Sequence, residues 1–402
     1  MNESRVNVIQ GHALTELRKL PAESVQCCVT SPAYFGLREY GTEPQIWGGD
    51  ADCEHEWDDA GTRRNRWGLD SGASEKQQSN RGNAWEIGQG AFCSRCGAWR
   101  GELGLEPTIS LYVEHLVSIF RELHRVLRKD GVFFLNIGDS YAGSGNGSND
   151  YRPEDASISK NSAKYRGQRP GAGRADGKVD ERGQRNRDGL GAVPGLKPKS
   201  LCGIPWRVAF ALQEDGWWLR SDIIWAKGCS FGPYHGNPMP ESVKDRPTRS
   251  HEYVFMLTKS ARYFYDAEEV KEPAKTGEWD AMPHIGGVKQ AEGSGNRTYS
   301  GNQPSGGGTR NLRDVWTIPT QANSLGHFAI MPEKLVEPCI KAATRPDDLV
   351  LDPFAGAGTV GKVALGLGRR FIGIELNPEY VELIRQRLDG VQLPMGLLDV
   401  AS

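Results

Sequence analysis

The clearest sign of the fold is LVLDPFAGAGTVGKVALGLG at residues 349–368, which has the pattern of a strand, a glycine-rich turn and a helix. Gly356, Gly358 and Gly361 fit the spacing G-x-G-x-x-G, in which glycine lets the backbone turn sharply and approach a ligand. Glu375 ends the next strand, where a carboxylate can hold a ribose diol. Taken alone, the pattern also fits a plain tight turn or a nicotinamide-binding domain.

The position of this glycine turn is unusual for a dehydrogenase, because only 27 residues follow Glu375. The other strands of the sheet must therefore come from upstream. Residues 5–34 have the pattern strand, helix, strand, and apolar strand and helix patterns also alternate after residue 204. The stretch LYVEHLVSIFRELHRVLR at 111–128 predicts a helix that ends in a turn at Lys129-Asp130-Gly131, before the buried strand VFFLNI. This alternation predicts an α/β fold with a largely parallel sheet.

A second motif, Ser31-Pro32-Ala33-Tyr34, follows the predicted strand QCCVT. The carboxyl ends of parallel strands form the ligand crevice of such a sheet. A hydroxyl, a rigid carbonyl and an aromatic ring there suit a planar amino-heterocycle, with two acceptors for an NH₂ group and one ring for stacking. The plainer interpretation is a turn that ends a strand, with Tyr34 packed on the core.

Together the two motifs resemble those of the amino-methylating DNA methyltransferases, which use S-adenosylmethionine. TSPAY at 30–34 corresponds to the acceptor motif (D/N/S)-P-P-(Y/F/W), and DPFAGAGT at 352–359 corresponds to the cofactor motif D-P-F-x-G-x-G-T. The acceptor half precedes the cofactor half, as in the permuted beta-type order. Segments 11–26, 204–227, 241–266, 327–340 and 373–380 also look similar to this family.

The resemblance implies a Rossmann-like, seven-stranded methyltransferase sheet and methyl transfer to an exocyclic amine of a base flipped out of double-stranded DNA. Two positions depart from the pattern. Ala33 replaces the usual second Pro, which makes the turn less rigid, and His12 stands where the family usually has Asp near the adenine. The implied catalytic residues are Ser31, Pro32, Ala33 and Tyr34, and the implied cofactor residues are His12, Phe328, Asp352, Pro353, Phe354, Gly356, Gly358, Thr359, Glu375 and Asn377.

Ser in the first position of the acceptor motif leans toward N4 of cytosine within this family, whereas Asp or Asn would lean toward N6 of adenine. N6-adenine methylation is the alternative, and a nicotinamide-dependent oxidoreductase is a remote one. A DNA-binding module without catalysis would need a damaged acceptor motif, for which Ala33 is the only hint. The Pro338-Cys339 pair lies in a predicted helix and is interpreted as structural.

Cys53-x-His55 and Cys93-x-x-Cys96 form a set of four ligands with the character of a zinc knuckle. A closed set of three thiolates and one imidazole leaves no open position, so the metal is predicted to be structural. The alternative is free thiols near a loop. Residues 41–105 are polar and aperiodic, so removal of zinc should loosen this segment while cofactor binding survives.

The 402-residue chain has a net charge of −2, 38% hydrophobic residues and no apolar run of membrane length. The sequence MNESRVNVIQGH also lacks a signal region, so we expect a cytoplasmic protein of prokaryotic or phage origin. Residues 151–200 carry 12 Lys and Arg against 6 Asp and Glu, which indicates either a flexible basic loop that contacts phosphate or a plain insertion. Double-stranded DNA is the expected partner, and a restriction endonuclease is a candidate second partner.

These patterns divide the chain into parts of the catalytic domain and insertions between them. The parts are the acceptor half (1–40), an insertion with the zinc knuckle (41–105), catalytic domain (106–140), the basic loop (141–200), catalytic domain (201–265), a polar segment for target recognition (266–325), the cofactor half (326–390) and a tail (391–402). For the Gly-rich part of 266–325 the alternative is a solvated linker.

Overall fold

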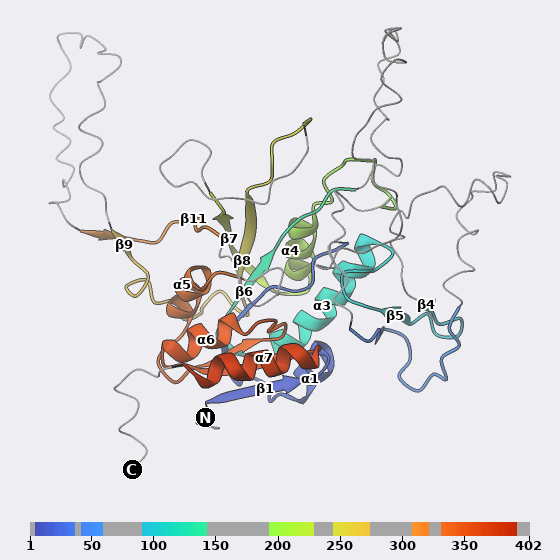
Figure 1. The fold of residues 1–402 in the computed structure, drawn as a ribbon, viewed down its shortest axis with the longest axis horizontal. Helices are drawn as coiled ribbons and strands as arrows, with labels where there is room; N and C mark the ends of the chain where they lie inside the picture. The colour runs from blue at the N-terminus through green and yellow to red at the C-terminus, as the bar shows by residue number, and fades with distance from the viewer. Residues whose placement is uncertain are drawn as a thin grey trace, which may run out of the picture.

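The computed structural model describes residues 5–36, 42–58, 91–142, 193–228, 244–273, 308–320 and 331–391. Within these ranges the fold is organised around one sheet of eight strands, in which only β8 runs antiparallel to its neighbours (Figure 1). In spatial order the strands are β1 (Val6–Gln10), β13 (Arg370–Glu375), β12 (Leu349–Asp352), β2 (Val25–Thr30), β6 (Leu127–Ile137), β8 (His251–Thr258), β7 (Trp218–Ala226) and β11 (Val315–Thr317).

The central strands are apolar on both faces because helices cover both sides of the sheet. All six residues of β2 are buried, with Cys28 in one core and Cys27 in the other. The first core includes side chains of α1 (Ala13–Lys19), α3 (Ile109–Val126) and α4 (Ile204–Glu214). The second includes side chains of α5 (Glu333–Ala343), α6 (Thr359–Gly366) and α7 (Pro378–Asp389).

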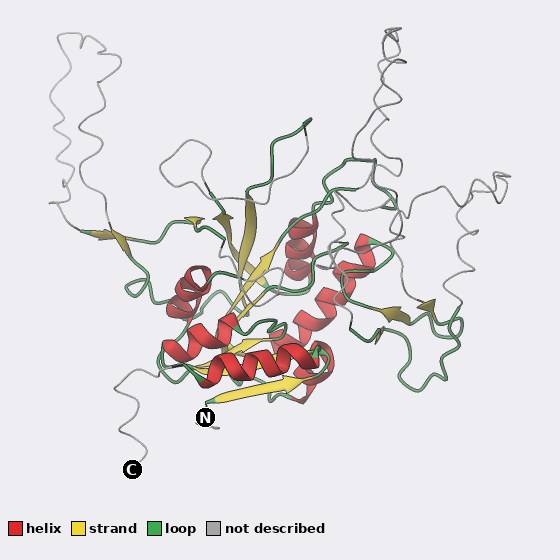
Figure 2. Ribbon diagram, in the orientation of Figure 1, coloured by secondary structure: helices red, strands yellow, loops and turns green. Residues whose placement is uncertain are grey.

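Two small sheets lie outside this framework (Figure 2). The strands β3 (Gln45–Trp47), β5 (Trp99–Gly101) and β4 (Ala91–Phe92) form an antiparallel sheet inside the segment predicted to hold the zinc knuckle. The strands β9 (Glu272–Pro273) and β10 (Thr309–Arg310) pair within the segment predicted for target recognition. Much of the basic loop (143–192), of the recognition segment (274–307 and 321–325) and of the tail (392–402) lies outside the described residues, as do the first residues of the cofactor half (326–330).

The α/β fold with its largely parallel sheet is confirmed, and two details of the prediction are wrong. The sheet has one strand more than the seven predicted, because β11 adds in parallel to β7 at the edge. Lys129-Asp130-Gly131 was predicted to form a turn between helix and strand, but it lies inside β6, where the pairing with β2 is irregular. None of the helices in the described ranges is long and apolar enough to cross a membrane.

Candidate active site

The two motifs meet at the edge of the sheet where β2, β12 and β13 end. They share one cavity of about 480 Å³, although Thr30 and Asp352 are 322 residues apart in the sequence. Both motifs thus face one shared space. The predicted residues that line it are His12, Ser31, Pro32, Ala33, Tyr34, Asp352, Pro353, Phe354, Gly356, Thr359, Glu375 and Asn377.

The glycine loop depends on the backbone freedom of glycine. Gly356 and Gly358 have φ angles of +52° and +75°, in the left-handed region that L side chains rarely adopt. A Cβ at Gly358 would also lie 3.0 Å from the Cγ2 of Ile384 on α7. Gly358 is the residue that caps α6. The loop therefore reaches this shape only with glycine at that position.

The side chain of Glu375, at the end of β13, holds the glycine loop through hydrogen bonds to backbone amides. One carboxylate oxygen accepts a hydrogen bond from the amide of Gly356 (2.8 Å) and the other accepts one from the amide of Asn377 (2.9 Å). Burial raises the pKa of this carboxyl group above its usual range. The carboxylate is thus fixed at the cavity wall.

Asp352 joins the two halves of the site. Its Oδ1 accepts hydrogen bonds from the hydroxyl of Thr30 (2.5 Å) and from the amide of Phe354 (3.1 Å). Thr30 directly precedes Ser31, so this contact ties the acceptor turn to the glycine loop. The carboxyl group is fully buried, and burial raises its pKa to about 7.

The acceptor turn is fixed by side chains from distant elements. The hydroxyl of Tyr34 lies 2.8 Å from Glu252 Oε2 and 3.2 Å from Asn136 Oδ1, and Ser31 Oγ lies 3.3 Å from the same hydroxyl. The carbonyl of Ala33 accepts a hydrogen bond of 2.7 Å from the hydroxyl of Tyr112 on α3. This bond restrains the turn at the position where proline is missing.

The cavity residues that were not predicted from the sequence include four on the acceptor side: Asn136, Trp225, Lys227 and Glu252. Lys227 forms an ion pair with Glu252, and its Nζ lies 5.0 Å from the centre of the Trp225 ring. For Asn136 and Lys227 the signal in the sequence was a polar residue at the end of an apolar strand, as in VFFLNI and IIWAK. That signal becomes specific only once the strand order is known.

His12 precedes α1 and stands edge-on to the indole of Trp47, with ring centres 4.6 Å apart. Its Nε2 is buried and has no hydrogen-bond partner among the described residues. Burial, together with the nearby charges of Arg18 and His115, lowers the pKa of His12 to about 4. The imidazole is therefore neutral at neutral pH. Of the two predicted aromatic contacts, Phe354 lines the cavity and Phe328 lies outside the described residues.

The four predicted metal ligands lie together, with their ligand atoms all within 4.8 Å of one another. Cys53 Sγ is 3.9 Å from Cys93 Sγ, and Cys96 Sγ is 3.4 Å from His55 Nδ1. Tetrahedral zinc with Zn–S bonds of about 2.3 Å sets two sulfurs about 3.8 Å apart. The geometry of the four side chains therefore fits zinc.

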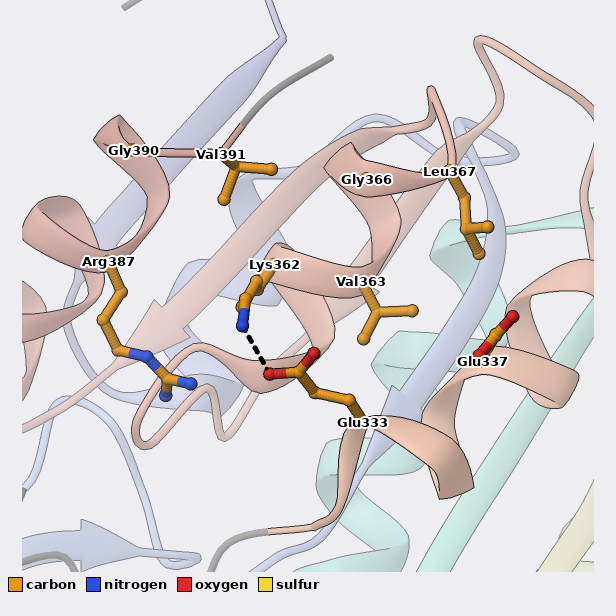
Figure 3. A pocket seen from close by; sticks show the side chains of 9 residues that line it. All are labelled: Glu333, Glu337, Lys362, Val363, Gly366, Leu367, Arg387, Gly390 and Val391. Carbon is orange, nitrogen blue, oxygen red and sulfur yellow. Dashed lines mark hydrogen bonds and ion pairs between the residues drawn. The ribbon is translucent and has the colours of Figure 1, made fainter. Parts of the chain in front are cut away.

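A second cavity of about 400 Å³ lies between α5, α6 and α7 (Figure 3). Lys362 reaches across it to Glu333, with a distance of 2.6 Å between the charged atoms, and Arg387 points in from α7. Of the predicted site residues that the structure describes, none lines this cavity.

Comparison with known proteins matches residues 25–386 to the model of the N6_N4_Mtase family, described as DNA methylase. The chain belongs to this family. The predicted resemblance is thereby confirmed, and the enzyme is a DNA methyltransferase and not a nicotinamide oxidoreductase or a binding module.

Similar proteins include three named Type II methyltransferases. M.XycI of Xanthomonas campestris pv. cyanopsidis is 40% identical over 95% of this chain and 87% of its own length. M.Cfr9I of Citrobacter freundii is 38% identical over the same shares. M.SmaI of Serratia marcescens is 34% identical over 95% of this chain and 90% of its own length.

Proposed function

We propose that this DNA methylase transfers a methyl group from S-adenosylmethionine to N4 of a cytosine flipped out of double-stranded DNA. The observation that carries the proposal is the shared cavity, which joins the glycine loop at 352–359 to the acceptor turn at 31–34. A reaction between two bound groups needs such a common space, because orientation supplies much of the acceleration.

The donor half of the cavity fits S-adenosylmethionine. His12 Nε2 and Thr359 Oγ1 are buried there without hydrogen-bond partners in the described chain, so a polar ligand has atoms to satisfy. The buried carboxyl group of Asp352 and the half-buried one of Glu375 suit a ligand carrying positive charge and hydroxyl groups. When bound, the cofactor supplies a methyl group on a positively charged sulfur.

The acceptor half fits an amino group on a planar ring. Ser31 Oγ and the Pro32 carbonyl accept the two amine hydrogens, which favours a more tetrahedral and more nucleophilic nitrogen. The ring of Tyr34 stacks on the base. The proton that the amine loses as it gains a methyl group has a hydrogen-bonded route from Ser31 through the Tyr34 hydroxyl to Glu252.

Two features favour cytosine over adenine. Ser31 occupies the first motif position, and Lys227 brings an ammonium donor to the acceptor side of the cavity. On its Watson–Crick edge cytosine presents a ring nitrogen next to its amine and a carbonyl oxygen beyond it, whereas adenine presents one ring nitrogen next to its amine. N6-adenine methylation is the competing outcome. The Type II names of the relatives support a cognate restriction endonuclease as a partner.

The test of the activity is methyl transfer from labelled S-adenosylmethionine to DNA, followed by digestion to nucleosides and mass spectrometry. We expect N4-methylcytosine from the wild type and a strongly reduced yield from Ser31→Ala. N6-methyladenine would overturn the assignment of the base. The absence of any labelled nucleoside, with a folded protein and DNA of mixed sequence, would overturn the activity.

We also propose that Cys53, His55, Cys93 and Cys96 hold one structural zinc ion. Elemental analysis of protein purified without chelator should give about one zinc per chain, and the three thiols should resist alkylation in the native state. Zinc near zero with all three thiols freely alkylated would exclude the site. The double variant Cys93→Ser with Cys96→Ser should lose the metal, whereas Cys202→Ser, outside the cluster, should keep it.

A further inference from the structure

Part of the cavity wall comes from the same segment that holds the cysteines. Trp47 on β3 and Leu103 after β5 line the cavity, and Trp47 packs against His12. Trp47 is only 3% exposed although it belongs to a three-residue strand. The insertion is therefore part of the donor side of the site.

Trp47 connects the small sheet to the catalytic domain. Its indole stacks on the ring of His115 on α3 at 4.5 Å and meets His12 edge-on at 4.6 Å. Its Nε1 donates a hydrogen bond of 3.1 Å to the carbonyl of Gly101 on β5. His115 is itself held by Glu106, at 2.9 Å. The position of the indole thus depends on β3 staying paired with β5.

The cysteine cluster lies directly behind this pairing. Trp47 is paired with Trp99, three residues after Cys96. A Cβ at Gly49, two residues after Trp47, would lie 2.8 Å from Cys96 Sγ, so the turn after β3 packs against the cluster. The amide of Cys93 donates to the carbonyl of Ala98 at 2.7 Å. Strands of two or three residues are marginal without further support, which metal ligation provides.

From this contact chain we infer that the metal ion held by the cluster fixes Trp47 against His12, and that metal binding and cofactor binding are therefore coupled. The inference rests on the proposed donor site and the proposed zinc ion. From the sequence we expected cofactor binding to survive loss of the metal. The inferred coupling differs from that expectation, because the sequence did not reveal that Trp47 lines the cavity. Couplings of this kind change affinity by about 5–150-fold, and they are reciprocal.

Calorimetry with S-adenosylhomocysteine, which binds without turnover, tests the coupling on the full-length protein. The zinc-loaded wild type should bind more tightly than the chelated protein by about 5–150-fold, and zinc should restore the affinity. The variant Trp47→Leu should bind S-adenosylhomocysteine weakly even with zinc bound, and removal of the zinc should change this affinity little. Ile46→Leu is the matched control, since Ile46 on the same strand is 49% exposed and should leave affinity unchanged.

The reciprocal measurement follows the release of zinc to a colorimetric chelator. Saturating S-adenosylhomocysteine should slow release from the wild type but not from Trp47→Leu. The coupling would be overturned if the affinity for S-adenosylhomocysteine were equal with and without zinc and if this ligand did not change the rate of zinc release. That result would leave the methyltransferase proposal intact. Failure of the folded, zinc-loaded wild type to bind S-adenosylhomocysteine would instead overturn the proposed donor site.

Discussion

The two halves of the cavity are built in different ways. In the donor half the glycine loop itself is held locally: Glu375 bonds to backbone amides 19 and 2 residues away, and Asp352 bonds to one 2 residues away. The acceptor half is assembled from distant parts: the turn at 31–34 is held by Tyr112, Asn136 and Glu252, with separations of 79, 102 and 218 residues.

This difference determines how each half tolerates change. A loop defined by backbone shape has few alternatives, because one added side chain blocks its conformation. A network of side chains distributes its restraint over several bonds, so the loss of one member weakens it by degrees. We therefore expect abrupt effects in the donor half and graded effects in the acceptor half.

The largest effect is expected from Gly358→Val. A side chain there meets Ile384 and requires a left-handed backbone, which costs about 1–2 kcal/mol by itself. Affinity for S-adenosylhomocysteine measured by calorimetry should fall at least about 100-fold, or about 2.7 kcal/mol. Gly366→Val is the control, since a Cβ at Gly366 meets nothing within 4 Å. Unimpaired binding by Gly358→Val would remove the loop from the site.

Ser31→Ala and Tyr34→Ala should separate the halves. Both lie on the acceptor side, so cofactor affinity should stay within about twofold while methyl transfer slows. Stacking on a base contributes about 1–3 kcal/mol, which predicts a loss of about 5–150-fold for Tyr34→Ala. Single-turnover transfer to DNA with prebound cofactor measures this loss. A folded variant that loses cofactor affinity instead would contradict the division of the cavity.

Cofactor binding should depend on pH through Asp352, whose pKa in the free protein is about 7. The positively charged sulfur of S-adenosylmethionine favours the ionised form of Asp352, so binding of this cofactor releases a proton. Affinity for S-adenosylmethionine should therefore fall by up to about tenfold per pH unit below 7. The pKa of His12, about 4, keeps that group from titrating there. Calorimetry in buffers of different ionisation enthalpy counts the protons.

Two controls sharpen this pH measurement. Uncharged methylthioadenosine and the variant Asp352→Asn should both show a flatter dependence of affinity on pH. Proton uptake on binding to the wild type would mean that the cation does not lie near Asp352.

The smallest effect is expected from Tyr112→Phe, which leaves the carbonyl of Ala33 without its partner. The Ala33 carbonyl is half-buried, and loss of a typical hydrogen bond costs about 0.5–1.5 kcal/mol, so denaturant unfolding should show a loss of that order. Methyl transfer should fall only a few-fold, because Tyr34 keeps its other partners. Tyr265→Phe, at an exposed residue, should leave stability within about 0.5 kcal/mol. A loss of transfer as large as that of Tyr34→Ala would show that the turn has a single essential support.

The same contrast explains what could be predicted from the sequence. The glycine loop, Glu375 and the four metal ligands are short patterns whose chemistry depends on spacing, and the structure brings each set together. Asn136, Lys227 and Glu252 were missed because their meeting depends on the order of β6, β8 and β7 in the sheet. The same holds for Trp47, whose place in the cavity follows from contacts between the insertion and α3.

The strand β11 and the irregular start of β6 were missed for another reason. Val315–Thr317 is too short for its periodicity to be recognised, and it is a strand only because β7 offers a free edge. Lys129-Asp130-Gly131 has turn chemistry, but β6 pairs with β2 on both sides of this segment, so the strand continues through it as an irregularity. In both places tertiary contacts outweighed local preference.

The most direct test of the shared cavity is a crystal structure of the protein with a non-reactive amine analogue of S-adenosylmethionine and a duplex carrying its target base. The proposal predicts a flipped cytosine with its N4 hydrogen-bonded to Ser31 Oγ, about 3–3.5 Å from the analogue atom that replaces the methyl group. A base that stays stacked in the duplex, or one seated away from Ser31 and Tyr34, would contradict it.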